Sequence, residues 1–320
     1  MLLETILQGN MQIEPRSYRD EADLTKMGSL LRAGSAAANG TFYAHIGDVN
    51  WSLYYPEFEG GLWPYLSLWD DPSDPDRLLA WSLTDPNWAT FDVYVQPEFR
   101  ETLLAEKIYI WAEEHIAAII RAAGQDKIRM NYIAENDEIV NTRLQARGFQ
   151  CIGAGTVCMS QSLDYPLPQP GLPEGYTVRG SKGETEVVAR ATAQYSAFTN
   201  TIPFDRYVDR FRGFMQSPVY DPELDVVAVA PDGRIDSFCI VWLDPVTGVG
   251  LFEPVGTHPD FQRRGLGKAV MSEALRRLKE RGMERAIVST NADNTPGIKL
   301  YEAAGFHITN RLGTYEKKLA

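Results

Sequence analysis

Cysteine is scarce in this 320-residue sequence, which contains only Cys151, Cys158 and Cys239. No two of them form a CxxC pair, so the sequence offers no readable zinc or redox motif. A disulfide between Cys151 and Cys158 is conceivable, but reduced thiols are the simpler interpretation. We therefore expect no metal site.

Positively charged residues are also few. The sequence has 31 lysine and arginine residues against 43 aspartate and glutamate residues, which gives a formal net charge of −12. Phosphate backbones and anionic lipid surfaces are bound by basic patches, so we expect neither nucleic acid nor a membrane as a partner. No apolar run approaches the ~20 residues of a membrane-spanning helix. The stretch Met1–Asn10 lacks the basic start of a signal peptide. We expect a cytoplasmic protein and leave its oligomeric state open.

The length of the chain suits about two domains of ~100–200 residues each. The clearest boundary is Asp164–Gly175, where four prolines and two glycines favour an extended connector over a helix or a central strand. We therefore divide the chain near residue 168, into domains of residues 1–168 and 169–320.

Hydrophobic periodicity in the second half predicts alternating strands and helices that form a mixed sheet. The turn Pro231-Asp232-Gly233-Arg234 indicates a hairpin between two of the strands. In chain order, the expected elements are a strand at Tyr176–Arg179, helices at Thr185–Phe198 and Arg206–Met215, strands at Leu224–Ala230, Ile235–Leu243 and Gly248–Val255, a helix at Gly267–Arg281, a strand at Ala286–Thr290, a helix at Gly297–Ala304 and a strand at Ile308–Lys318.

The first half repeats the closing order of these elements. We expect a strand at Phe91–Val95, a helix at Thr102–Ala123, a strand at Lys127–Ile133 and a helix at Ile139–Ala146. Pro97 and Phe99 then correspond to Pro259 and Phe261, and Gly148-Phe149 corresponds to Gly305-Phe306. This indicates a duplicated domain rather than a short-period repeat.

Glycines and cations gather where the strand Gly248–Val255 leads into the helix Gly267–Arg281. The first amides of a helix have no internal partner and lie at the positive end of its dipole. Gly265 and Gly267 would let the backbone approach an anion without a Cβ in the way, and the neighbouring Arg263, Arg264 and Lys268 add positive charge. The loop predicts a diphosphate site, although such a loop alone is more often a surface turn.

A second motif follows the next expected strand and contains Asn294, Leu300-Tyr301 and Gly305-Phe306. Combined with Gln262, Gly265 and Gly267, it makes the sequence resemble the GCN5-related N-acetyltransferase (GNAT) family, which has a Q/R-x-x-G-x-G/A loop followed by an Asn…Leu-Tyr…Gly-Phe motif. The resemblance is strong over about residues 224–318 and depends on element order alone over 176–223. It implies two tandem GNAT-like domains, each with a mixed, mostly antiparallel sheet flanked by helices.

The resemblance also implies how acetyl-CoA is held. In this family the strand before the loop separates from its neighbour and pairs with the pantetheine arm, a place that suits Pro254 because proline removes a ladder donor. The implied coenzyme-binding residues are Val255, Gly256 and Thr257 on the strand, Gln262, Arg263, Arg264, Gly265, Leu266, Gly267 and Lys268 in the loop and helix start, and Asn294, which would touch the pantetheine or fix the neighbouring loop.

Glu253 and Tyr301 are the candidate catalytic residues. Glu253 lies two residues before Val255, so we expect both on the same side of the strand, where Glu253 would be the general base. It would equally suit binding of a cationic substrate or a solvated strand end. Tyr301 matches the family's general acid, which protonates the departing thiolate, but a core aromatic is the alternative. His258 suits a surface turn and Cys239 a packed thiol. Candidates to line the acceptor pocket are Tyr195, Phe198, Asp205 and Trp242, each equally suited to a core or surface position.

The first half departs from the family pattern in the loop. Leu103 and Ala105 stand where Gly265 and Gly267 stand, and Glu101 replaces Arg263, so bulk and negative charge would oppose a diphosphate. Leu144 takes the place of Tyr301. We expect a degenerate copy that binds no coenzyme. Its aromatic-rich region suits core packing, and also an interface or the acceptor cleft; the residues are Trp51, Tyr54, Tyr55, Trp63, Tyr65, Trp69, Trp81 and Trp88.

The function that this resemblance implies is transfer of an acetyl or other short acyl group from acetyl-CoA to a primary amine by direct attack. The acceptor, a small-molecule or peptide amine, is not identified by the sequence. Two alternatives stay open: a non-catalytic acyl-CoA-binding regulatory protein, and an aminoacyl transferase of tandem GNAT fold. Glu253 and Tyr301 argue against the first, and the intact loop and acidic composition argue against the second.

Overall fold

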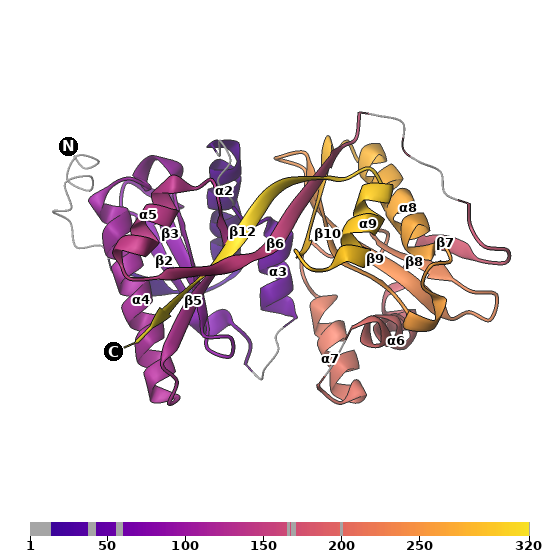
Figure 1. Ribbon diagram of the computed structural model, residues 1–320, viewed down its shortest axis with the longest axis horizontal. Coiled ribbons are helices and arrows are strands. Elements are labelled where there is room, and N and C mark those ends of the chain that lie inside the picture. The colour runs from indigo at the N-terminus through magenta and orange to yellow at the C-terminus, as the bar shows by residue number, and fades with distance from the viewer. Residues whose placement is uncertain are drawn as a thin grey trace. The chain divides into compact units, whose positions relative to one another are not determined.

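The computed structural model describes residues 14–37, 43–55, 60–164, 167, 171–198 and 201–319. It divides the chain into two compact units (Figure 1). The N-unit is Met1–Ala44, Phe58–Thr156 and Asn310–Ala320, and the C-unit is His45–Glu57 and Val157–Thr309. Met1–Asn10 and part of the expected connector Asp164–Gly175 lie outside the described residues. The domain boundary near residue 168 stays a prediction.

The N-unit is a sheet with strand order β1-β2-β3-β4-β5-β12, accompanied by helices α2, α4 and α5. Helix α4 buries Leu104, Ile108, Ala112 and Ile116, which recur at helical spacing on one face. The element bounds are β1 Arg16–Ser17, α2 Glu21–Ala37, η1 Trp63–Tyr65, β2 Leu66–Asp71, β3 Asp74–Asp85, β4 Thr90–Val95, η2 Pro97–Phe99, α4 Leu103–Ala122, β5 Lys127–Ala134 and α5 Glu138–Ala146.

The C-unit is a sheet with strand order β6-β11-β10-β9-β8-β7. Strand β10 pairs in parallel with β11, whereas the β7–β8, β8–β9 and β9–β10 pairs are antiparallel. The element bounds are α3 Ile46–Tyr54, β6 Gln150–Ser162, β7 Thr177–Gly180, η3 Gly183–Glu186, α6 Val187–Ala197, α7 Phe204–Phe214, β8 Asp225–Val229, β9 Ile235–Asp244, β10 Val249–Thr257, η4 Pro259–Phe261, α8 Leu266–Glu280, β11 Arg285–Asn291 and α9 Thr295–Ala303. The chain then ends with the N-unit strand β12, His307–Lys318.

These elements confirm the predicted α/β class with mixed, mostly antiparallel sheets. Every helix and strand expected from periodicity is present, with its ends within about two residues of the expected ones. The buried stripe of α8 is also confirmed, because Val270, Ala274, Leu275 and Leu278 are all fully buried. Within the described ranges, no helix is both long and apolar enough to cross a bilayer.

One helix from the first part of the sequence belongs to the C-unit. Helix α3 packs against β9, β10 and α7. The buried Ser217 hydroxyl and the Asn50 side chain share a 3.0 Å hydrogen bond, and Arg210 donates to the Tyr55 carbonyl at 2.9 Å. These bonds hold both the middle and the end of the segment His45–Tyr55 within the C-unit.

The last strand belongs mainly to the N-unit. From Leu312 to Lys318, β12 pairs antiparallel with β5. Tyr315 of this stretch is buried in the N-unit core, and its hydroxyl lies 2.6 Å from the Asn141 side-chain oxygen. The N-unit sheet is therefore completed by residues that lie nearly two hundred positions further along the chain.

The aromatic-rich region of the first half divides between the two units. Trp69 and Trp81 are fully buried in the N-unit, as core packing predicts, whereas Trp88 is 59% exposed. Trp51 and Tyr55 stack on each other at 4.3 Å between ring centroids and join an aromatic cluster of the C-unit. The interpretation as core packing is therefore confirmed for Tyr55, Trp69 and Trp81, which are buried, but not for Trp88.

Candidate active site

Strand β10 separates from β11 halfway along its length. The parallel register runs from Val249 opposite Arg285 to Phe252 opposite Val288 and, among the described residues, goes no further. Strand β10 nevertheless continues to Thr257 and stays paired with β9 on its other side. The backbone edge after Phe252 therefore faces a gap between two strands, where an extended ligand can pair with main-chain groups.

A bulge lies at the point of separation. The register with β9 shifts between Phe252 and Val255, and Pro254 occupies the bulge after a cis peptide bond. The expected position of Pro254 at a bulge or edge is thus confirmed. The expectation that Glu253 and Val255 share a side was wrong, because the extra residue interrupts the regular alternation: Val255 packs on the same core as Phe252, while the Glu253 carboxyl meets Asp48 of α3.

The loop after β10 presents backbone amides. Arg263 has φ +60° and Gly265 has φ +85°, and the intervening turn leads directly into α8. Among the described residues, no backbone carbonyl accepts from the amides of Arg263 or Gly265, and the first α8 bond is that of Ala269 to Gly265. Left-handed residues on either side of a residue that is not left-handed, just before a helix, form a concave nest of N–H groups that suits an anion.

The loop is fixed to the end of β10. Gln262 donates to the Thr257 carbonyl at 3.3 Å, and the Thr257 and Ser237 hydroxyls lie 2.8 Å apart. A Cβ on Gly267 would approach the Thr257 hydroxyl to 3.3 Å, and a Cβ on Gly256 would approach Phe238 to 2.4 Å. The small residues at these positions therefore bring the helix start and the strand end together.

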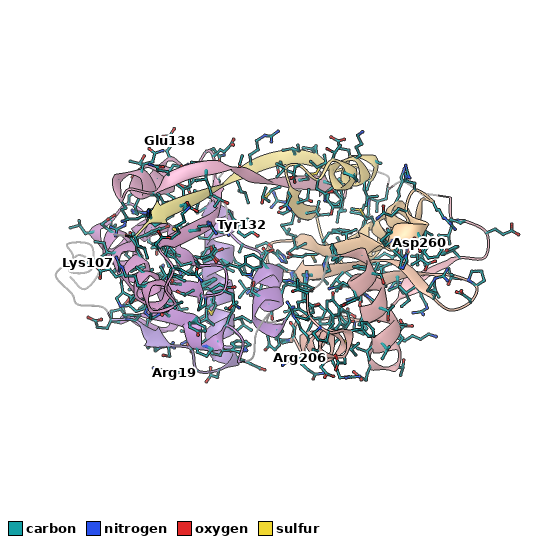
Figure 2. The ribbon with its side chains drawn as sticks, turned by 60° about the horizontal axis from the view of Figure 1, so that its bottom comes forward. Arg19, Lys107, Tyr132, Glu138, Arg206 and Asp260 are labelled. Atoms are coloured by element: carbon teal, nitrogen blue, oxygen red, sulfur yellow. The ribbon has the colours of Figure 1, made fainter. Side chains whose placement is uncertain are left out.

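The side chains of the other predicted loop residues are either exposed at the surface or packed against the protein. Arg263 and Arg264 are exposed, Lys268 is half-buried and Leu266 is buried. His258 caps the turn by accepting from the Asp260 amide at 3.2 Å. Asp260 itself lies at the surface of that turn (Figure 2).

Asn294 is the N-cap of α9. Its side-chain oxygen accepts from the Gly297 amide at 3.1 Å, and its side-chain nitrogen donates to the Thr290 hydroxyl at 2.8 Å. Of the two roles implied for this residue, fixing the neighbouring loop is therefore present in the geometry. The role in pantetheine binding stays a prediction.

The two candidate catalytic residues lie in one neighbourhood. Tyr301 is 6% exposed, and burial, together with nearby Cys239 and Glu253, raises its pKa to about 12. The hydroxyl is therefore protonated at neutral pH, as a general acid requires. Cys239 is fully buried, and burial raises its pKa, so the interpretation as a packed thiol is confirmed. The position of Tyr301 in the core also fits the packing alternative, so its catalytic role stays a prediction.

Glu253 is held in an apolar setting beside a second acid. Its backbone carbonyl accepts from the Trp242 indole at 2.7 Å, and its Oε2 is buried with no hydrogen-bond partner among the described residues. Burial, then the charge of Asp48, raises its pKa well above the ordinary glutamate value. A carboxylate whose pKa is raised is a stronger base, so it takes up a proton more readily than an exposed glutamate. Trp242, a candidate for the acceptor pocket, is fully buried and supports Glu253 instead.

Asp48 was not found from the sequence. It lies at the third position of α3, whose N-cap is His45 rather than a serine, threonine, asparagine or aspartate. The first turn therefore lacks the usual capping signal. No spacing in the sequence relates it to a glutamate more than two hundred positions away.

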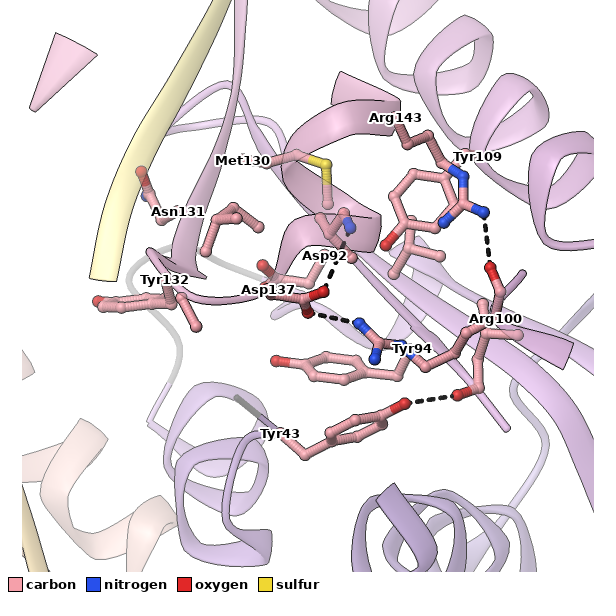
Figure 3. A pocket seen from close by; sticks show the side chains of 15 residues that line it. Tyr43, Asp92, Tyr94, Arg100, Tyr109, Met130, Asn131, Tyr132, Asp137 and Arg143 are labelled. Atoms are coloured by element: carbon pink, nitrogen blue, oxygen red, sulfur yellow. Dashed lines mark hydrogen bonds and ion pairs between the residues drawn. The ribbon is translucent and has the colours of Figure 1, made fainter. Parts of the chain in front are cut away.

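The corresponding cleft of the N-unit is filled by its own side chains. A cavity of about 50 Å³ lies between β4 and β5, which share only the register pair Thr90–Arg129. Arg100 and Asp137 form an ion pair across it, and Arg143 donates to the Arg100 carbonyl at 2.6 Å (Figure 3). Leu103, at the position equivalent to Gly265, is 61% exposed.

The described part of the chain has no group of three or more His, Cys, Asp or Glu side chains arranged to hold a metal ion. The separated strands and the amide nest suit an extended diphosphate ligand, and Glu253 and Tyr301 lie in one neighbourhood, but the roles of these residues stay predictions.

The comparisons with known proteins agree with this fold. Residues 191–306 match the model described as "Acetyltransferase (GNAT) family". This C-terminal stretch therefore matches the family, and the resemblance seen in the two sequence motifs is confirmed for it.

A mycothiol acetyltransferase from Saccharomonospora viridis is 28% identical over 203 residues, which make up 60% of this chain and 66% of that protein. Other curated relatives of the same name are matched over 46% and 50% of their own lengths. The matched part of the chain therefore spans between 46% and 66% of these relatives' lengths.

Two solved structures resemble nearly the whole chain. A GCN5-related N-acetyltransferase from Sphaerobacter thermophilus has a TM-score of 0.63 at 24% identity, over 94% of both chains. A tandem GNAT protein from the clavulanic acid biosynthesis pathway has a TM-score of 0.69 at 15% identity, over 96% of this chain and 98% of its own. At these identities the likeness shows the tandem fold alone.

Proposed function

We propose that this protein is an acetyl-CoA-dependent N-acetyltransferase whose acceptor is a small-molecule or peptide primary amine. The main observation is the separation of β10 from β11 after Phe252, which leads directly to the amide nest at Arg263–Gly265. A strand edge followed by a nest fits the two parts of acetyl-CoA, an extended amide-bearing arm and a diphosphate. This fit supports the family's co-substrate for this chain.

The backbone of Val255, Gly256 and Thr257 would pair with the pantetheine arm. The amides from Arg263 to Lys268 would bind the diphosphate, with Arg263, Arg264 and Lys268 adding charge. Acetyl-CoA would supply an acetyl thioester to this site. Among the side chains that position it, Asn294 keeps the start of α9 in place through its cap.

Glu253 and Tyr301 would carry the two proton transfers. Glu253 takes a proton from the acceptor ammonium, which frees the nitrogen lone pair to form the new C–N bond. As the C–S bond breaks, Tyr301 donates its proton to the sulfur, and the phenolate then regains a proton from solvent. Direct attack needs no nucleophile on the protein, so orientation and these two groups supply the catalysis.

The test is an assay of CoA release with a panel of amines, and the name of the curated relatives makes a mycothiol-related amine the first acceptor to try. We expect Tyr301→Phe to reduce kcat by about 10²–10⁴-fold, the usual contribution of a general acid, without changing the Kd for acetyl-CoA.

Tyr315→Phe is the matched control, because Tyr315 is buried to a similar degree but lies in the N-unit core. It should lose stability through its hydrogen bond to Asn141 and keep its turnover. Unchanged kcat in Tyr301→Phe would remove this residue from the mechanism. Acetyl-CoA binding without turnover of any amine would contradict the proposed activity.

A further inference from the structure

The carboxyl group of Asp48 is fixed at the start of α3. Its Oδ2 accepts from the His45 amide at 2.7 Å, and His45 Nδ1 accepts from the Gly47 amide at 3.0 Å. The other ring nitrogen, Nε2, lies 3.3 Å from the Val249 carbonyl. Because Nδ1 accepts a hydrogen, Nε2 must carry the ring proton, so His45 is the neutral tautomer.

Gly47 lets α3 approach the residue that supports Glu253. A Cβ on Gly47 would lie 2.6 Å from Trp242, so only glycine permits this contact without a shift. The Trp242 indole in turn donates to the Glu253 carbonyl at 2.7 Å. Helix α3, Trp242 and the β10 bulge thus form one packed set that brings the Asp48 and Glu253 side chains together.

The carboxyl groups of Asp48 and Glu253 come close enough for a hydrogen bond between them. Such a bond exists only while one carboxyl keeps a proton, because two carboxylates have no donor between them. Asp48 is better supported as the anion, since it accepts the His45 amide and lies in the first turn of a helix. The buried Oε2 of Glu253 has no such support among the described residues. The proton therefore resides on Glu253 in the resting protein.

We infer that Asp48 is a positioning residue for acetyl transfer: its carboxylate holds the protonated Glu253 carboxyl in place and determines when that carboxyl is free to act as the base. This inference rests on the proposed acetyltransferase function. Glu253 must first release its proton to solvent, and it then accepts one from the acceptor ammonium as the C–N bond forms. The negative charge of Asp48 delays the first step to higher pH.

Other titratable groups surround the pair on several elements. His45 lies on α3 itself, Cys158 on β6 lies close enough for the Asp48 charge to raise its thiol pKa further after burial, and Tyr301 on α9 is affected in the same way by Glu253. The Cys158 thiol and the Tyr301 hydroxyl both stay neutral when their pKa rises. Cys158 and Tyr301 therefore keep their charge as the pH rises from acid to neutral, whereas the Asp48 and Glu253 carboxyls change theirs.

The experiment measures kcat/KM against pH and, separately, titrates the carboxyl groups of the protein without substrate by NMR of ¹³C-labelled side chains. Asp48→Asn keeps an oxygen for the His45 amide and replaces the shared proton by a permanent N–H donor without charge. We expect the midpoint of the Glu253 titration to fall by about one pH unit. The acid limb of the kcat/KM profile should fall by the same amount, so that kcat/KM increases about tenfold at pH values below the wild-type limb. Asp209→Asn, which removes an exposed acid of α7, should move neither.

Glu253→Gln gives a second, reciprocal test that needs no activity, because Asp48 then loses the shared proton that favours its anion, and its titration midpoint should rise. An unchanged Glu253 midpoint in Asp48→Asn, or an unchanged Asp48 midpoint in Glu253→Gln, would overturn the inference while leaving the acetyltransferase proposal intact. Full turnover by Glu253→Gln would instead show that the proposed base is wrong, and the role of Asp48 would be lost with it.

Discussion

A charge placed at Gly265 gives the sharpest test of the diphosphate site. Any side chain at φ +85° carries a backbone penalty of about 1–2 kcal/mol. Sterically the position is open, since the nearest heavy atom to an added Cβ is the Gly171 carbonyl oxygen at 3.8 Å. Gly265→Glu and Gly265→Gln therefore share the backbone penalty and nearly the same volume, and they differ in one negative charge.

That charge sets the size of the effect. Two unit charges ~5 Å apart in water repel by about 0.8 kcal/mol, and a diphosphate presents at least two. We therefore expect the Gln-to-Glu difference to be about 1.6 kcal/mol, or roughly fifteenfold in the Kd for acetyl-CoA. Because the site is exposed, the difference should shrink as salt is added.

Calorimetric titration with acetyl-CoA measures these affinities. Gly233→Glu is the matched control, because Gly233 has φ +88° in the β8–β9 hairpin, and an added Cβ there meets no described atom within 4 Å. It should lose similar stability and keep the wild-type Kd. Equal affinity of the Glu and Gln variants at position 265, or weakening in Gly233→Glu, would refute the placement of the diphosphate.

Two further predictions concern stability and stoichiometry. The raised pKa of Glu253 means that its contribution to stability is complete below the unfolded pKa and is lost as the pH rises through the folded pKa. Thermal denaturation should therefore show Glu253→Gln gaining on wild type from pH 5 to pH 9, by about 1.4 kcal/mol for each pH unit that separates the folded from the unfolded pKa; a constant difference would contradict this. Calorimetry should give one acetyl-CoA per chain, since the Arg100–Asp137 pair fills the N-unit cleft; two sites would contradict it.

The second half of the fold could be predicted because local signals agreed with each other. Helix α8 carries its apolar stripe at regular spacing and ends before Gly282, and the Gly233 turn marks the β8–β9 hairpin. The amide nest was predictable for the same reason, since glycine at 265 and the helix start after it are both visible in the sequence. Such features depend on neighbours a few residues apart.

The features that were missed depend on distant contacts. Helices α2 and α3 and strands β1, β2, β3 and β6 had no expected counterpart. Helix α3 begins with an unusual cap at His45. It includes Gly47, where the absence of a side chain allows close contact with Trp242. The wrong side assigned to Glu253 has a similar origin, because the bulge at Pro254 is a property of the pairing between β10 and β9. The sequence of one strand does not by itself determine its register with the neighbouring strand.

The pairing of β12 with β5 has a consequence for biosynthesis. Leu312–Lys318 supplies the partner of Lys127–Ala134, so the N-unit sheet stays incomplete until the ribosome has released residues near position 318. Ordinary tandem domains fold in order as they emerge. Here the N-unit begins to be translated first but completes its sheet last. Until β12 is released, the unpaired edge of β5 is exposed, and we expect a chaperone to protect it from pairing with other chains.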